Sequence, residues 1–338
     1  MKRISCLSFV VVIILLACKG KQEGRPSGRE ALKAFGLVHD TLSLKALVAD
    51  ITKTNVLMGG AVGIDGRRPE QWDRFDLLRT KASDQELIAL TDDTNAVVRC
   101  YAFQALAEKN YVDVYPIVIC HLSDTATVRT INGCLIGSKK AGDLMLDGVY
   151  SKCGQDGNRH LNTDQREVVD SLLIYGNDNR LDKRNMVLSR IEPAKRYYVG
   201  VRRLATVEKN KEAVVALSKY RKKSDIPIIK EFLNDPHSQK FGFAAVKNFP
   251  DPSFYPYLEK ALKDEIKNDK ENDVQELYYA IVQYKNKASR ELLKFALSEA
   301  KDMKYIHHSD YLSQALREYP APIYEGLVKP IYTGRPLR

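Results

Sequence analysis

Residues 83–106, SDQELIALTDDTNAVVRCYAFQAL, carry the clearest helical pattern in the sequence. Ser83 and Glu86 have the spacing of a capping box, in which each side chain bonds the backbone N–H of the other residue and fixes a helix start. Apolar residues follow at helical spacing, stop over the polar residues 91–95, and resume from Val97. The stretch therefore predicts two short antiparallel helices joined by a tight polar turn.

A weaker copy of this pattern follows in residues 113–129, and the step from Arg99 to Arg129 is 30 residues. Helical hairpins that recur every 30 to 45 residues are typical of solenoids. Residues 87–106 resemble the HEAT-like repeat family, which implies an all-α fold, a right-handed α-solenoid of helical hairpins. In that family the turn aspartate commonly pairs with the arginine of the next helix. The resemblance implies the pair Asp93 and Arg99 and, one residue closer, the pair Asp124 and Arg129.

A second periodic feature fills the C-terminal part. An alanine precedes an aromatic residue by four positions at places 29, 35 and 35 residues apart: Ala216 and Tyr220, Ala245 and Phe249, Ala280 and Tyr284, Ala315 and Tyr319. We expect each aromatic residue to end a helix, and the next helix to begin near a proline, which suits a first helical turn. Helical repeats are expected over 201–338.

The N-terminal repeats are expected over 36–200, with one irregular part. Five glycines interrupt the pattern between residues 135 and 205: Gly137, Gly142, Gly148, Gly154 and Gly157. Loops or an irregular repeat are expected there. Since no segment alternates polar and apolar residues over a sustained length, a sheet is not expected.

The N-terminus has the layout of a secretion signal. Lys2 and Arg3 precede an apolar run of about ten residues that is too short to span a membrane, which needs roughly 20. Residues 15–18, Leu-Leu-Ala-Cys, resemble the lipobox of bacterial lipoproteins. That resemblance implies that residues 1–17 are a cleaved signal and that Cys18 is acylated. The glycine, proline and charged residues that follow show no apolar period and predict a flexible tether over 18–35. An ordinary signal cleaved elsewhere is the alternative.

The anchor also suggests a location. Lys19 is not the aspartate that retains many enterobacterial lipoproteins at the inner membrane. We therefore expect the protein to be attached to the outer membrane through the lipid on Cys18, facing the periplasm.

The net charge of +10 falls to about +8 once the signal is removed. Export makes nucleic acid an improbable partner, so the positive charge suits anionic lipid, cell-wall polymers or an acidic protein. Basic residues cluster near 183–223, and the predicted contacts with a protein partner are Arg202, Arg203, Arg221 and Lys222. The alternative is that these residues lie on solvated helix faces.

The cysteines leave a disulfide possible. Cys6 leaves with the signal and Cys18 carries lipid, so Cys100, Cys120, Cys134 and Cys153 remain, and four thiols allow three pairings. Cys134 and Cys153 are the predicted pair because both flank the glycine-rich segment. Cys100 lies within an apolar helical pattern and is expected in the core.

No constellation of residues indicates catalysis, and no cofactor or metal is predicted. Residues 58–69 are rich in glycine, but they lack the lysine and hydroxyl of a phosphate-binding loop, so a surface loop is expected. Trp72 either packs the first helix pair or anchors an interface. A metal site using Cys120, His121, Cys134 or Cys153 with His160 is the less favoured interpretation of those residues.

The favoured function is a non-enzymatic scaffold that binds an envelope protein, because stacked hairpins form an extended surface and the lipid holds it at a membrane. Two alternatives stay open. One is an unrecognised envelope enzyme or ligand-binding protein that uses the glycine-rich middle segment, and the other is a lipoprotein that neutralises a toxin.

Overall fold

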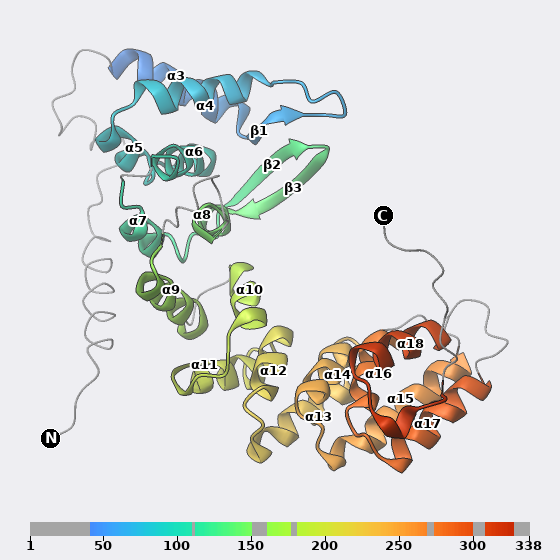
Figure 1. Ribbon diagram of the computed structural model, residues 1–338. Coiled ribbons are helices and arrows are strands. Elements are labelled where there is room, and N and C mark those ends of the chain that lie inside the picture. Colours follow the sequence, from blue (N-terminus) through green and yellow to red (C-terminus); the bar gives the residue numbers. More distant parts are fainter. Residues whose placement is uncertain are drawn as a thin grey trace, which may run out of the picture. The chain divides into compact units, whose positions relative to one another are not determined.

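The computed structural model describes residues 41–109, 112–150, 161–176, 181–268, 274–299 and 308–327 (Figure 1). These residues form mostly helices, as predicted, together with a small three-stranded sheet. They group into two compact units, unit 1 (Met1–Arg184) and unit 2 (Asn185–Arg338), which are described separately. The division thus falls at Arg184, before the expected boundary at residue 200. The predicted signal (1–17) and tether (18–35) lie outside the described residues.

Unit 1 is built from helices that pack in pairs. The pairs are α3 (Thr41–Thr54) with α4 (Glu70–Lys81), α5 (Asp84–Leu90) with α6 (Ala96–Ala107), and α7 (Tyr115–Cys120) with α8 (Ala141–Tyr150). The second helices also pack on one another in succession, α4 on α6 and α6 on α8. A further helix follows, α9 (Thr163–Tyr175), and the unit ends within α10 (Lys183–Arg190), most of which belongs to unit 2.

The helical hairpin predicted for residues 83–106 is confirmed as α5 and α6. The capping box forms: the Glu86 N–H donates to Ser83 Oγ at 3.3 Å, and the Ser83 N–H donates to Glu86 Oε2 at 2.8 Å. Asn95 caps α6 by accepting the N–H groups of Val97 and Val98. Ala102 and Ala105 are fully buried, so small side chains lie where α6 meets its neighbours.

The expectation that no sheet forms is wrong. β1 (Leu57–Val62) lies between α3 and α4, and a hairpin of β2 (Thr127–Gly133) and β3 (Leu135–Lys140) lies between α7 and α8. β1 pairs with β2 in parallel, and β2 pairs with β3 antiparallel (Figure 1). The strands are short, and β3 is mostly exposed. They therefore lack the long alternation of polar and apolar residues that indicates a strand in a sequence. Pairing between two distant insertions is what stabilises them.

The sheet also revises the reading of the glycine-rich residues 58–69. Their first part is β1, and Gly60 lies against Trp72 of α4, since a Cβ on Gly60 would be 3.2 Å from the indole ring. Trp72 in turn packs on Phe75, with ring centroids 4.8 Å apart. The tryptophan therefore joins the first helix pair to the sheet.

The second predicted hairpin and the irregular segment also differ from expectation. Val128 and Arg129 lie on β2 instead of a helix, because the turn at Gly133 folds residues 127–140 into a β-hairpin. Gly142 and Gly148 lie within α8 and permit close packing instead of loops. A Cβ on Gly142 would be 2.7 Å from the carbonyl oxygen of His121. Gly154 and Gly157 lie outside the described residues.

The ion pairs implied by the repeat resemblance form differently. Arg99 pairs with the carboxylate of Asp124, at 2.8 Å, and both side chains are only 12% exposed. Arg99 also donates to the backbone carbonyl of Asp93, at 2.8 Å, whereas the Asp93 carboxylate accepts the N–H of Asn95. Arg129, the expected partner of Asp124, lies on β2, and the Asp124 carboxylate is engaged by Arg99. Arg99 therefore connects the turn before α6, at Asp93, to the turn that follows α7, at Asp124.

Unit 2 repeats the pairing of helices. The first helices are α11 (Lys195–Thr206), α13 (Ile226–Asn234), α15 (Tyr255–Asn268) and α17 (Lys287–Glu299), and the second helices are α12 (Lys211–Ser218), α14 (Gln239–Asn248), α16 (Val274–Val282) and α18 (His308–Glu318). Each second helix packs on the next, from α12 to α18. Short 3₁₀ turns, η1 (Lys223–Asp225), η2 (Pro252–Phe254) and η4 (Pro322–Tyr324), lie between or after them.

The alanine and aromatic period is confirmed in unit 2. The four alanines are buried at 2% exposure or less, and each aromatic residue follows the last turn of its helix. The Tyr220 hydroxyl donates to the carbonyl of Ala194 at 2.8 Å, and the Tyr284 hydroxyl donates to the carbonyl of Asp251 at 2.7 Å. Each of these tyrosines thus ties the end of one helix to the start of the first helix of its own pair.

The Arg99 ion pair predicts a measurable loss of stability. Arg99→Met leaves the Asp124 carboxylate without its cation in a mostly buried place, so the free energy of unfolding at pH 7 should fall by about 2–4 kcal/mol. Asp124→Asn in the same chain should recover part of that loss, because no unpaired charge then remains. Trp72 is the single tryptophan and lies in unit 1, so its fluorescence during urea unfolding reports this unit.

The same pair should make the stability depend on pH. Burial alone would raise the pKa of the Asp124 carboxyl, but the hydrogen bond with His121 and the charge of Arg99 outweigh burial and hold this pKa below its ordinary value. A depressed pKa gives a contribution that is complete above the unfolded pKa of about 3.9 and is lost as the pH falls below it. The gap between wild type and Arg99→Met should therefore narrow below pH 4. A constant gap from pH 7 to pH 3 would contradict this account.

Candidate functional site

Two surfaces among the described residues are candidate functional sites. Within them, no three His, Cys, Asp or Glu side chains gather where they could hold a metal ion. His121 is buried, with Nδ1 3.6 Å from Asp124 and Nε2 3.7 Å from Asp92, while Cys153 and His160 lie outside the described residues. None of the helices in the described ranges is both long enough and apolar enough to span a bilayer.

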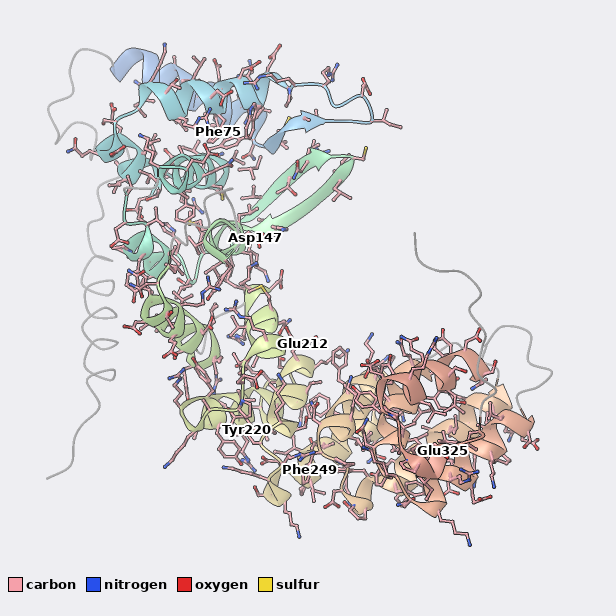
Figure 2. The ribbon with its side chains drawn as sticks, in the orientation of Figure 1. Phe75, Asp147, Glu212, Tyr220, Phe249 and Glu325 are labelled. Atoms are coloured by element: carbon pink, nitrogen blue, oxygen red, sulfur yellow. The ribbon has the colours of Figure 1, made fainter. Side chains whose placement is uncertain are left out.

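A compact group of charged and aromatic side chains lies at the turns of α11, α12 and α13. We call Tyr198, Arg202, Tyr220, Lys222 and Asp225 the Tyr198 cluster. The rings of Tyr198 and Tyr220 lie 5.2 Å apart, and Tyr220 follows α12 (Figure 2). The ammonium of Lys222 lies 3.3 Å from the centroid of the Tyr198 ring, which is a cation–π contact.

Asp225 holds this cluster together. Its carboxylate is 1% exposed and accepts the Tyr198 hydroxyl at 3.0 Å and Arg202 Nε at 3.1 Å. A buried carboxylate is costly unless it is paired and hydrogen-bonded, and both conditions are met here. Asp225 therefore fixes the side chains of Tyr198 and Arg202, and Tyr198 in turn positions Lys222.

The structure brings together two of the four predicted partner contacts. Arg202 and Lys222 belong to the Tyr198 cluster, and Arg221 precedes Lys222, with its Nε donating to the carbonyl of Asn248 at 2.9 Å. Arg203 points elsewhere and pairs with Glu208 at 2.8 Å. Sequence reasoning missed Tyr198 and Asp225. The signal was the aspartate directly before Ile226 and Pro227, where a helix start was expected.

The surface around the Tyr198 cluster is cationic. Part of its positive charge lies at a helix N-terminus, where cations lower helix stability. Lys195 and Arg196 are exposed in the first turn of α11, which carries no acidic residue. Cations at a helix N-terminus oppose the helix dipole. Lys195, Tyr198 and Arg202 are spaced to share one helix face, and Lys222 and Lys223 add exposed charge beside it. This cationic ridge therefore concentrates positive potential.

A second surface lies at the end of the sheet in unit 1. We call Ile64, Gly133, Cys134, Leu135 and Ile136 the sheet tip. The Gly63 N–H donates to the carbonyl of Gly133 at 3.0 Å, so the turn after β1 and the turn of the β-hairpin are joined. Ile64 is 95% exposed, Leu135 78% and Ile136 68%. Three aliphatic side chains are thus presented to solvent at one end of a small sheet.

Only one of the two cysteines in the predicted disulfide lies within the described residues. Cys134 is an exposed free thiol in the sheet tip, and Cys153 lies outside the described residues, so the disulfide between them stays a prediction. Cys134 occupies the two-residue turn of the hairpin beside Gly133, whose φ is +56°. Cys100 is buried in α6, as expected, and burial raises the pKa of its thiol to about 12.

Comparison with known protein families, with characterised proteins and with solved structures gives no match. The resemblances to HEAT-like repeats and to a lipobox therefore stay predictions. The case for a function rests on the two surfaces described above.

Two acidic residues that pair with arginines of α11 give a matched test of the Tyr198 cluster. Asp225→Asn removes a buried charge that organises two partners and should lower the stability of α11 to α13 by about 1–3 kcal/mol. Glu208→Gln affects a pair whose side chains are 29% and 31% exposed, and it should change stability by less than about 1 kcal/mol. Hydrogen exchange of the α11 to α13 amides measures both. Equal protection in the two variants would contradict the organising role of Asp225.

Proposed function

We propose that this protein is a lipoprotein of the bacterial cell envelope that acts as a non-enzymatic scaffold for a protein partner. In this proposal the helix pairs form a right-handed α-solenoid of HEAT-like hairpins, and acylated Cys18 attaches the protein to the periplasmic side of the outer membrane. The packing of each second helix on the next, within each unit, supports a repeat architecture. Repeat proteins of this kind commonly bind partners along extended surfaces.

The observation that carries the proposal is the cationic ridge above the Tyr198 cluster. Lys195, Arg196, Arg221, Lys222 and Lys223 are exposed, and Asp225, the acidic residue at their base, is already engaged. Cations placed at a helix N-terminus cost stability, so their presence favours a role in recognition. Aromatic rings held beneath the cations limit their freedom, which reduces the entropy lost on binding.

The partner that fits this ridge is an acidic protein segment. Arginine and lysine donors attract carboxylates, and complementary charge accelerates encounter and selects partners. The predicted export signal makes nucleic acid an improbable ligand in the compartment where the protein would act. An envelope protein with a cluster of Asp and Glu residues is therefore the proposed partner.

The test is crosslinking in intact cells with the anchored protein, followed by identification of what is captured. Lys222→Glu with Lys223→Glu reverses two exposed charges and leaves Arg202 and Asp225 in place. This variant should recover the wild-type partner at least about tenfold less efficiently. The matched control is Lys260→Glu with Lys267→Glu, which makes the same charge change at exposed positions on α15 and should recover the partner normally.

Two results would contradict the proposal. One is recovery of the same partner in equal yield by the Lys222 and Lys223 variant, with its fold verified by circular dichroism. The other is equal loss in the α15 control, because net charge alone would then explain the binding.

A further inference from the structure

We propose that the sheet tip inserts its aliphatic side chains into an anionic lipid surface, giving the protein a second membrane contact besides the lipid on Cys18. The observation is the exposure of Ile64, Leu135 and Ile136, at 95%, 78% and 68%. They come from two segments about 70 residues apart, and the sheet places them at one end. The inference rests on the proposed envelope anchor, which would bring a bilayer within reach.

The tip is held firmly enough to present these side chains together. β1 is fixed to α6 by Tyr101, whose hydroxyl donates to the carbonyl of Met58 at 3.0 Å and accepts the Met58 N–H at 2.7 Å. The Gly63 N–H bond to Gly133 then joins the two turns at 3.0 Å. The Tyr101 side chain is fully buried. The three exposed aliphatic residues therefore lie at a sheet end that hydrogen bonds connect to α6.

The charges near the tip suit an anionic surface. Arg67 lies three residues after Ile64 and Arg129 lies on β2 opposite Ser138; both are exposed, and the acidic residue beside Ile64 is Asp65. Farther down the β-hairpin the lysines are already neutralised, since Lys139 pairs with Asp147 at 2.7 Å and Lys140 pairs with Asp182 at 2.9 Å. The tip thus combines an apolar end with a small positive balance, and such a combination favours anionic lipid headgroups.

The length of chain before α3 allows simultaneous anchoring and insertion. Cys18 and Thr41 are 23 positions apart. At roughly 3.5 Å per residue that length spans at most about 80 Å. α3 has 14 residues, which is about 20 Å of helix, and β1 begins three residues after its end. A bilayer that holds Cys18 is therefore within reach of the sheet tip.

Cys134 supplies a probe at the tip itself. The protein is produced without residues 1–17 and with Cys18, Cys120 and Cys153 changed to serine, which leaves the exposed Cys134 thiol and the buried Cys100 thiol. Cys134 is labelled with an environment-sensitive fluorophore. Vesicles with about 30% phosphatidylglycerol in phosphatidylcholine should shift its emission to the blue, and nitroxide groups on the lipid chains should quench it. Phosphatidylcholine vesicles should give a weaker response.

Flotation of unlabelled protein with the same vesicles separates insertion from an effect of the dye. Ile64→Ser, Leu135→Ser and Ile136→Ser together should reduce the fraction bound at least about tenfold, because the apolar area is lost. Val199→Ser with Val207→Ser is the control. It removes two side chains of similar exposure, 68% and 74%, from unit 2 and should bind as wild type does.

Unchanged Cys134 emission with anionic vesicles, or equal flotation of the triple variant and wild type, would overturn the inference. A tip that binds a protein segment instead of lipid would give those same results with vesicles. Because the protein used here carries no acyl chain, the outcome is independent of whether Cys18 is acylated. The outcome is also independent of partner recovery at the cationic ridge. Failure of this inference is therefore distinguishable from failure of the proposed function.

Discussion

The constraint on which unit 1 depends is the burial of α6 on nearly all sides. Nine of its twelve residues are buried, and a helix that is apolar all round requires neighbours in several directions. α4 and α8 pack on either side, α5 packs against it as its hairpin partner, and Tyr101 reaches out to clamp β1. Unit 2 shows the same logic in α16, where seven of nine residues are buried between α14 and α18. A helix pair alone would leave such a helix half exposed.

The packing of the helices determines where the strands and the Tyr198 cluster lie. β1 is inserted between the two helices of the first pair, and the β-hairpin is inserted between the two helices of the third pair. Equivalent connections of a repeat array emerge on one side, so two insertions far apart in sequence meet and form a sheet. The Tyr198 cluster joins two side chains of α11 to residues of the connection that follows α12. Both candidate surfaces are thus products of the helix packing, since connections are free to vary while the buried rows are not.

The sequence predicted the parts that depend on local patterns. The capping box at Ser83, the helical hairpin that follows it, and the alanine and aromatic period of unit 2 all rest on neighbouring residues, and they form as expected. Long-range pairing was missed. β1 pairs with a strand about 70 residues away, and Arg99 pairs with the carboxylate of Asp124, 25 positions on, which no short spacing rule predicts.

The candidate surfaces show the same division. The run of basic residues from 202 to 222 was visible in the sequence, but the buried Asp225 that organises them was not, because a carboxylate before a helix start ordinarily indicates only a cap. The sheet tip escaped notice because its exposure depends on a sheet that the sequence did not predict. Exposed aliphatic residues are informative only once the fold shows that they gather.

We propose that the protein is held at a membrane through Cys18 and presents its two candidate surfaces from there. Mass spectrometry of the mature N-terminus, on protein isolated from the membranes of the producing cell, tests this most directly. We expect residues 1–17 to be absent. Cys18 should carry a diacylglyceryl group on its sulfur, and its amine should be either acylated or free. A mature protein that begins at another residue, or an unmodified Cys18 thiol, would contradict it.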